Sequence, residues 1–286
     1  MDRPDTLKLL AAEAGRGELT FPTSATVVLR VRQALDDPDC QTETAVRLIQ
    51  AEPLLSARVV AVANSAAFNR SGRTITDVRA AVNLLGFRTV RNLATAMVAR
   101  QMAGIPDGHA QRDLATQLWE HSVHVAALAQ VIARRVTRQD PEAALFAGMV
   151  HEIGGFHLLS RVKDFPGLLD GEPEDWMGED EGATGVSPES EIGHAVLTAL
   201  SVPEPVVAAI EILWKGYLAF PPTTLGDTLL LADQLAPIKS PLFQTPGKNP
   251  GEMAATIDLL VEQDTLSHIL KESAEEVQSL TEALRL

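Results

Sequence analysis

Two histidines and two carboxylates in the second half of the chain are the residues best suited to metal chemistry. His151 and Glu152 follow an apolar run that predicts a buried helix, and a histidine beside a carboxylate is a pair that binds borderline cations. His121 lies on the inward stripe of a long predicted helix, and Asp233 lies in a further apolar segment. A divalent cation held by these four side chains would lower the pKa of a bound water and hold phosphate oxygens.

The same residues also have a purely structural interpretation, in which a buried histidine is hydrogen-bonded to a carboxylate and no metal is present. The residues alone leave both interpretations open. We expect no cofactor unless this site is functional. In that case the cofactor would be a divalent metal, namely iron, manganese or zinc. His194 follows Gly193 near the start of a predicted helix, where it is either a further ligand or a helix-end histidine.

A basic segment in the first half is the second candidate for function. Residues 54–105 contain seven arginines against one aspartate, a net charge of +6. Arg88 and Arg91 are one helical turn apart, and Arg70 and Arg73 lie in a predicted connection. Guanidinium groups suit carboxylate and other anion recognition, so these four are a candidate partner or anion face. The alternative is that they pair with the acidic second half across the seam between two subdomains.

The overall charge and the cysteine count exclude several classes of protein. The net charge is −14, with +3 over residues 1–112 and −17 over the remainder, so nucleic-acid binding is not expected. Cys40 is the single cysteine and forms no internal disulfide, which favours a reducing compartment. The first residues lack the layout of a signal peptide, and no run of about 18 apolar residues occurs. We therefore expect a cytoplasmic protein with no membrane partner.

The composition predicts an all-α fold. Apolar residues make up 45% but aromatic residues only 4%, so the core must be built from the small and branched aliphatic residues. Gly86 is expected to end one helix, and residues 170–191 are expected to form an acidic, solvated loop. Helices are predicted over residues 7–14, 27–35, 43–50, 53–64, 77–85, 89–103, 114–136, 143–150, 156–161, 193–200, 204–214, 225–235 and 264–284.

Several linked motifs, in order, closely resemble the HDOD domain, the HD-related output domain of bacterial signalling proteins and a divergent branch of the HD/HD-GYP phosphohydrolase superfamily. The resemblance covers roughly residues 18–240. The motifs that carry it are Phe21-Pro22, Leu35-Asp36-Asp37-Pro38, residues 51–58, 62–66 and 75–82, Leu84-Leu85-Gly86, residues 118–122, His151-Glu152-Ile153-Gly154, Gly193-His194 and Ala232-Asp233.

The resemblance implies a multi-helical fold in which an N-terminal helical subdomain, residues 1–105, packs on an HD-like subdomain, residues 106–240. Residues 241–286 would then form a linker and a C-terminal helix. By position His121, His151, Glu152 and Asp233 match the minimal metal ligands of the superfamily.

This chain departs from the superfamily in its central motif. It reads His-Glu-Ile-Gly-Gly where the superfamily has His-Asp-Ile-Gly-Lys, so Glu152 stands for the aspartate and Gly155 for the lysine. Relatives that cleave cyclic di-GMP carry a histidine pair further on, where this chain has Ile212, Leu213 and Trp214.

The resemblance therefore implies a regulatory module of signal transduction that is non-catalytic and acts by binding a protein partner or a ligand such as a cyclic dinucleotide. With no sensory domain in this chain, its output would act in trans. The alternative is a metal-dependent phosphohydrolase that acts on a nucleotide or cyclic dinucleotide.

Overall fold

The computed structural model of this chain describes residues 2–19, 23–103, 108–169, 187–216, 218–219, 221–242 and 266–285. Every regular element within these ranges is a helix, which confirms the predicted all-α class. Within the same ranges, none of the helices combines the length and the apolar character that crossing a bilayer requires.

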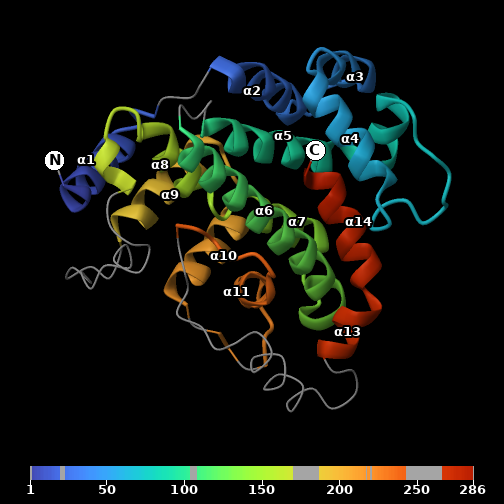
Figure 1. The fold of residues 1–286 in the computed structure, drawn as a ribbon. Coiled ribbons are helices and arrows are strands. Elements are labelled where there is room, and N and C mark those ends of the chain that lie inside the picture. The colour runs from blue at the N-terminus through green and yellow to red at the C-terminus, as the bar shows by residue number, and fades with distance from the viewer. Residues whose placement is uncertain are drawn as a thin grey trace.

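The first half of the chain is organised around one long helix, α5, on which α2, α3 and α4 pack (Figure 1). Apolar residues at the centre of this layer, such as Val28, Ile49 and Leu55, are fully buried. The N-terminal helix α1 packs instead on α9 of the second half. The helices of this half are α1 (Arg3–Gly15), α2 (Thr23–Asp36), α3 (Thr42–Gln50), α4 (Pro53–Asn64) and α5 (Val78–Met102).

The second half is built around the paired helices α6 and α7, against which α11 and α14 pack (Figure 1). Helix α6 continues into a π-helical turn, η1. The elements are α6 (His109–Ile132), η1 (Ala133–Thr137), α7 (Pro141–Val150), α8 (Ile153–Arg161), the 3₁₀ turn η2 (Pro166–Leu169), α9 (Pro188–Ala199), α10 (Glu204–Lys215), α11 (Leu225–Leu235), α13 (Leu266–Glu272) and α14 (Ala274–Arg285).

Acidic caps fix where several of these helices begin. The Glu52 carboxylate accepts a hydrogen bond from the backbone N–H of Leu55, with Pro53 in the first turn of α4. The Asp140 carboxylate accepts from the N–H groups of Glu142 and Ala143 at 2.9 and 3.3 Å, and so begins α7. A carboxylate in this position satisfies donors that have no partner within the helix.

The structure moves several predicted helix boundaries, and α1, α2, α6 and α8 begin three to five residues before the predicted starts. At Gly86, where one helix was expected to end, the backbone is non-helical with φ 75° and ψ 162°, so two helical stretches meet at a kink within α5; only glycine adopts such angles without strain. The predicted C-terminal helix is divided at Ser273 into α13 and α14. Helix α9 begins at Pro188, capped by the hydroxyl of Ser187, so it starts inside the predicted acidic loop.

The rest of that loop, residues 170–186, lies outside the described residues, as do residues 104–107 at the expected subdomain boundary and residues 243–265 of the expected linker. The division into residues 1–105, 106–240 and 241–286 therefore stays a prediction.

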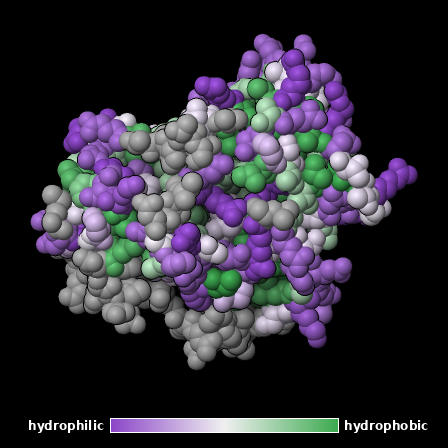
Figure 2. Space-filling view, turned by 45° about the horizontal axis from the view of Figure 1, so that its top comes forward, coloured by the Kyte–Doolittle hydropathy of each residue, from purple (hydrophilic) through white to green (hydrophobic). Residues whose placement is uncertain are grey.

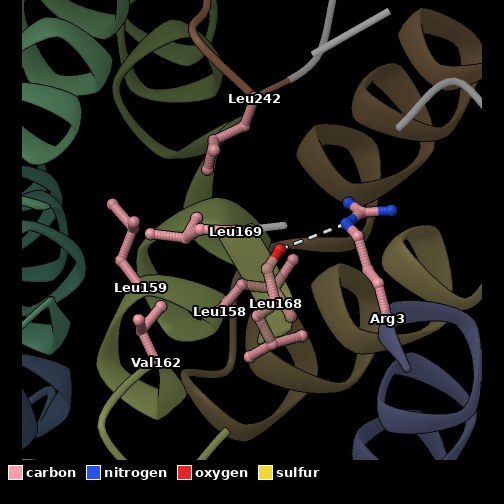
Figure 3. A pocket seen from close by; sticks show the side chains of 7 residues that line it. All are labelled: Arg3, Leu158, Leu159, Val162, Leu168, Leu169 and Leu242. Carbon is pink, nitrogen blue, oxygen red and sulfur yellow. Dashed lines mark hydrogen bonds between the residues drawn. The ribbon is translucent and has the colours of Figure 1, made fainter. Parts of the chain in front are cut away.

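One small apolar pocket lies between α8, η2 and Leu242 (Figure 3). Arg3 of α1 reaches across to it and donates a hydrogen bond from Nε to the carbonyl of Leu168 at 3.2 Å. The pocket volume is about 10 Å³, which is room for one water molecule rather than for a substrate. On the face drawn in Figure 2, hydrophilic residues predominate and hydrophobic ones form small groups between them.

Candidate metal centre

Three helices bring together three of the four predicted ligands. His121 comes from the middle of α6, His151 follows the last residue of α7, and Asp233 lies near the end of α11. One potential ligand atom of each lies within 4.8 Å of the others. The histidines are 1% and 4% exposed and the side chain of Asp233 is 14% exposed, so the cluster is a buried one.

Two of the three separations between these atoms fit coordination to a single cation, and the third is within 4.8 Å. His121 Nε2 lies 3.1 Å from His151 Nε2 and 3.1 Å from Asp233 Oδ1. Ligand atoms about 2.0–2.2 Å from one metal, at angles between the octahedral and tetrahedral values, are about 2.8–3.6 Å apart. Two imidazoles and a carboxylate are also a donor set that iron, manganese and zinc accept.

Backbone carbonyls hold both imidazole rings in the orientation that a metal site requires. His121 Nδ1 donates to the carbonyl of Ile238 at 2.8 Å, and His151 Nδ1 donates to the carbonyl of Gly148 at 2.7 Å. Because Nδ1 carries the proton on each ring, the lone pair of a neutral ring is on Nε2, which faces the cluster. Metal-binding histidines are commonly oriented by such outer hydrogen bonds.

Glu152, the fourth predicted ligand, lies beside this group of three but not within it. Its Oε1 is 3.7 Å from His121 Nε2 and 3.9 Å from His151 Nε2, and the residue is 4% exposed. A hydrogen bond with Ser240 holds the carboxylate. The carboxylate is therefore near both imidazoles, on the inner side of the cluster.

The buried environment shifts the pKa of every member of the cluster. Burial raises the pKa of Glu152 to about 7 and, with the charge of His121, lowers that of His151 to about 4. Burial alone would lower the pKa of His121, but the hydrogen bond to Asp233 and the nearby carboxylates outweigh it and raise the pKa. Burial opposes ionisation of Asp233, yet its hydrogen bond with His121 keeps its pKa below the ordinary value. Without a metal, the cluster therefore favours a protonated His121 between Asp233 and a neutral His151.

His194 lies apart from the cluster. Its Nδ1 is 3.0 Å from Glu211 Oε1 on α10, and its side chain is 52% exposed. His194 lies in the middle of α9 rather than near a helix start, where the sequence predicted it, and its exposed position outside the cluster makes it a useful control residue.

The four arginines of the candidate anion face have different surroundings. Arg88 binds Asp140 at 2.7 Å and Glu142 at 2.8 Å, which is the pairing with the second half that the sequence left as an alternative. Arg91 lies 3.1 Å from Asp36 of the first half. Arg70 and Arg73 are exposed in the connection between α4 and α5. An anion-binding role for this face stays a prediction.

The sequence analysis missed a second arginine cluster around Trp119 of α6. The guanidinium carbons of Arg58 and Arg100 lie 5.7 and 5.2 Å from the centre of the indole ring. Arg58 is only 3% exposed, and its Nε and Nη1 have no hydrogen-bond partner among the described residues. The signal was present in the sequence as the basic segment, but nothing in helical periodicity showed which arginines are buried.

A histidine outside the cluster gives a prediction for acid stability. Burial, with a smaller effect of Arg161, lowers the pKa of His157 to about 4, and its Nδ1 has no partner among the described residues. Between pH 6.5 and 4 the unfolded chain binds this proton and the folded chain does not, so stability falls as pH falls. Between pH 7 and pH 4, the free energy of unfolding of wild type should fall by about 3 kcal/mol more than that of His157→Gln. Urea unfolding at each pH measures this difference. Parallel pH profiles would contradict this assignment.

Comparison with known proteins identifies the family. The family model of the HDOD domain matches residues 21–215. A crystal structure from Shewanella amazonensis SB2B, named as a candidate metal-dependent phosphohydrolase, is similar with a TM-score of 0.73 and 21% identity, covering 98% of both chains. A structure from Marinobacter aquaeolei VT8, named as a candidate signal transduction protein, has a TM-score of 0.57 and 20% identity over 100% of this chain and 62% of that one.

Among curated proteins, an uncharacterized protein of Treponema pallidum (strain Nichols) is 26% identical over 218 residues, 72% of this chain. The match spans only 40% of the length of that relative. At these identities the solved structures support the shared helical fold alone. The family model, however, matches more than half of this sequence, and the chain belongs to the HDOD family.

Proposed function

We propose that this chain is a non-catalytic regulatory module of signal transduction that acts by binding a protein partner, and that its buried cluster holds one divalent metal in a structural role. The name given to the Marinobacter structure supports the signalling context. His121, His151 and Asp233 would hold the cation, and Glu152, whose Oε1 lies 3.7 and 3.9 Å from the two Nε2 atoms, would move slightly inward to become the fourth ligand. The bound cation would supply a cross-link between α6, α7 and α11.

The observation that carries this proposal is the closed character of the cluster. Catalytic zinc sites keep one coordination position open for water or substrate, whereas structural sites are filled by four protein ligands. Here a fourth side chain, Glu152, lies 3.7 and 3.9 Å from the two Nε2 atoms, and His121, His151 and Glu152 are each at most 4% exposed. A cation surrounded in this way has little access to a phosphate ester.

The sequence departures support the same conclusion. Gly155 stands where the resemblance expects a lysine, so this position offers no cation to a phosphate group. Gly155 and Phe156 are both buried in α8, which makes the position part of the core. Binding of a cyclic dinucleotide remains the alternative to a protein partner, and no role at a membrane or on nucleic acid is proposed.

Metal binding is tested by calorimetric titration of chelator-treated protein with Zn²⁺ and Mn²⁺. We expect one equivalent in wild type and a loss of at least about 100-fold in affinity in His151→Ala and Asp233→Asn, because each removes a direct ligand. His194→Ala is the matched control, since it removes a histidine paired with a carboxylate outside the cluster. Equal binding by wild type and His151→Ala would contradict the proposed ligand set.

One observation favours the alternative of a metal-dependent phosphohydrolase. The pKa of Glu152 is raised to about 7, which is the range that suits a general acid or base. In that case Glu152→Gln would abolish a metal-dependent hydrolysis while leaving the calorimetric binding of the metal. The burial of Glu152 is the reason that we place this function second.

A further inference from the structure

Helix α14 covers a surface, called the groove below, that carries arginines of α4 and η1 and also Glu120 of α6, which lies 2.6 Å from Arg285 of α14. It packs on α6 and on α4, and it runs beside both in Figure 1, where it is red. This helix and α13 lie beyond residue 215, where the family match ends. The helices that form the groove, α4 and α6, therefore lie within the matched residues, whereas α14, which occupies it, lies outside them.

Ion pairs fasten α13 and α14 along the groove. Arg134 Nη2 binds both carboxylate oxygens of Glu276 at 2.6 and 2.7 Å, and Arg135 Nη2 lies 2.6 Å from Glu272 Oε2. These four side chains are between 22% and 48% exposed. Partly exposed ion pairs give specific geometry but only modest stability, and salt weakens them.

The contact beneath α14 leaves polar groups without partners. Thr281 of α14 is buried, and its hydroxyl has no hydrogen-bond partner among the described residues. Arg58 of α4, against which α14 packs, is equally buried with two unpartnered nitrogens. Trp119, which Arg58 faces, donates from Nε1 to the carbonyl of Leu284 at 3.1 Å. Buried donors without acceptors cost free energy, so α14 is an imperfect occupant of this groove.

The groove residues also define what a better occupant would carry. Arginine and tryptophan are the residue types that most often dominate binding energy at protein interfaces. Arg134 and Arg135 already take carboxylates from α13 and α14, while Arg58 has none among the described residues. An amphipathic helix that carries carboxylates would pair with Arg134 and Arg135 as well as α13 and α14 do. It would also provide a hydrogen-bond acceptor for Arg58.

We propose that this groove between α4 and α6 is the docking site for an acidic amphipathic helix of a partner protein, and that α14 is a self-bound occupant which the partner displaces. This inference rests on the proposed binding function, but it uses a surface separate from the metal cluster. Because α14 belongs to the same chain as the groove, its effective concentration there is high, and the groove stays closed until a partner competes with it.

Hydrogen exchange on the whole wild-type chain is the first test. If α14 is displaceable, its amides open by local release, and the amides facing the groove should exchange at least 100-fold faster than those in the middle of α6. Exchange as slow as that of α6 would show that α14 unfolds only with the core, which would overturn the proposal.

A displacement experiment is the second test. The probe is a labelled peptide of residues 266–285, and the host is the full chain with Glu272→Ala and Glu276→Ala, which loosens its own helix pair. We expect the peptide to bind this host at least tenfold more tightly than wild type. The control host, Glu18→Ala with Glu43→Ala, removes two ion pairs with Arg16 and Arg79 elsewhere on the surface and should behave as wild type.

A peptide in which Glu272 and Glu276 are replaced by glutamine should bind the loosened host at least tenfold more weakly, because it loses the ion pairs with Arg135 and Arg134. Equal binding of both peptides, no gain in the loosened host, or loss of its folded state would each overturn the docking proposal. Metal-dependent phosphohydrolysis would instead contradict the proposed function, so the two failures are distinguishable.

Discussion

Gly148→Ala should destabilise the protein by about 3 kcal/mol or more and disrupt the metal cluster as well. A Cβ at this position would lie 2.4 Å from Cα and 2.6 Å from the backbone nitrogen of Ala126. These are backbone atoms of α6, so no side-chain rotation relieves the clash, and α6 and α7 must move apart. Because His121 and His151 lie on either side of this contact, their 3.1 Å Nε2 separation should increase with it.

Urea unfolding and metal titration of the same sample would measure both effects. Gly15→Ala is the matched control, because a Cβ there meets nothing within 4 Å and Gly15 ends α1 with an ordinary helical conformation. We expect that variant to be as stable as wild type or up to about 1 kcal/mol more stable, since alanine favours a helix over glycine. A Gly148→Ala protein of wild-type stability would show that the α6–α7 contact is not as close as described.

Trp119→Ala should lower the free energy of unfolding by about 3–5 kcal/mol, which is the range for truncating a buried aromatic residue. The indole is 4% exposed, meets Phe156 edge to face at 6.3 Å, and lies beside the guanidinium groups of Arg58 and Arg100. Its removal leaves a cavity and takes away the ring that both guanidinium groups contact. Thermal or urea unfolding measures the loss.

Trp119→Phe separates packing from hydrogen bonding at the same position. It retains an aromatic ring but loses the Nε1 hydrogen bond to Leu284, so we expect a loss of about 1–2 kcal/mol. Hydrogen exchange should also show faster opening of the end of α14 in this variant. A loss below about 1 kcal/mol for Trp119→Ala would mean that the ring is not the centre of this contact.

The sequence predicted the helices well because their signals are local. Pro53 at the start of α4 and the apolar run of α7 are read directly from neighbouring residues. The break at Gly86 was placed correctly, because a glycine after a helical run is a local signal for non-helical backbone. The division at Ser273 has a local signal that the prediction overlooked, because Ser273 is followed three residues later by Glu276, the spacing of a capping box at a helix start.

The candidate site was predictable in its residues but not in its geometry. His121 could be assigned inward from its helical stripe, and the structure places it 3.1 Å from Asp233, which is 112 positions later in the chain. Which carbonyls would orient the rings, those of Ile238 and Gly148, depends on long-range packing that periodicity does not encode. The same limit explains why Arg88, part of the predicted anion face, is paired with Asp140 and Glu142.

The most direct test of the proposed closed metal centre is to load wild type and His151→Ala with Mn²⁺, Fe²⁺ or Zn²⁺, determine bound metal by elemental analysis, and assay the same samples for hydrolysis. The substrates would be a cyclic dinucleotide and a simple phosphodiester. We predict about one equivalent of metal in wild type, loss of the metal in His151→Ala, and no turnover in wild type above that of the variant. Turnover in wild type that requires the metal and disappears in His151→Ala would contradict the closed, non-catalytic site and establish a phosphohydrolase.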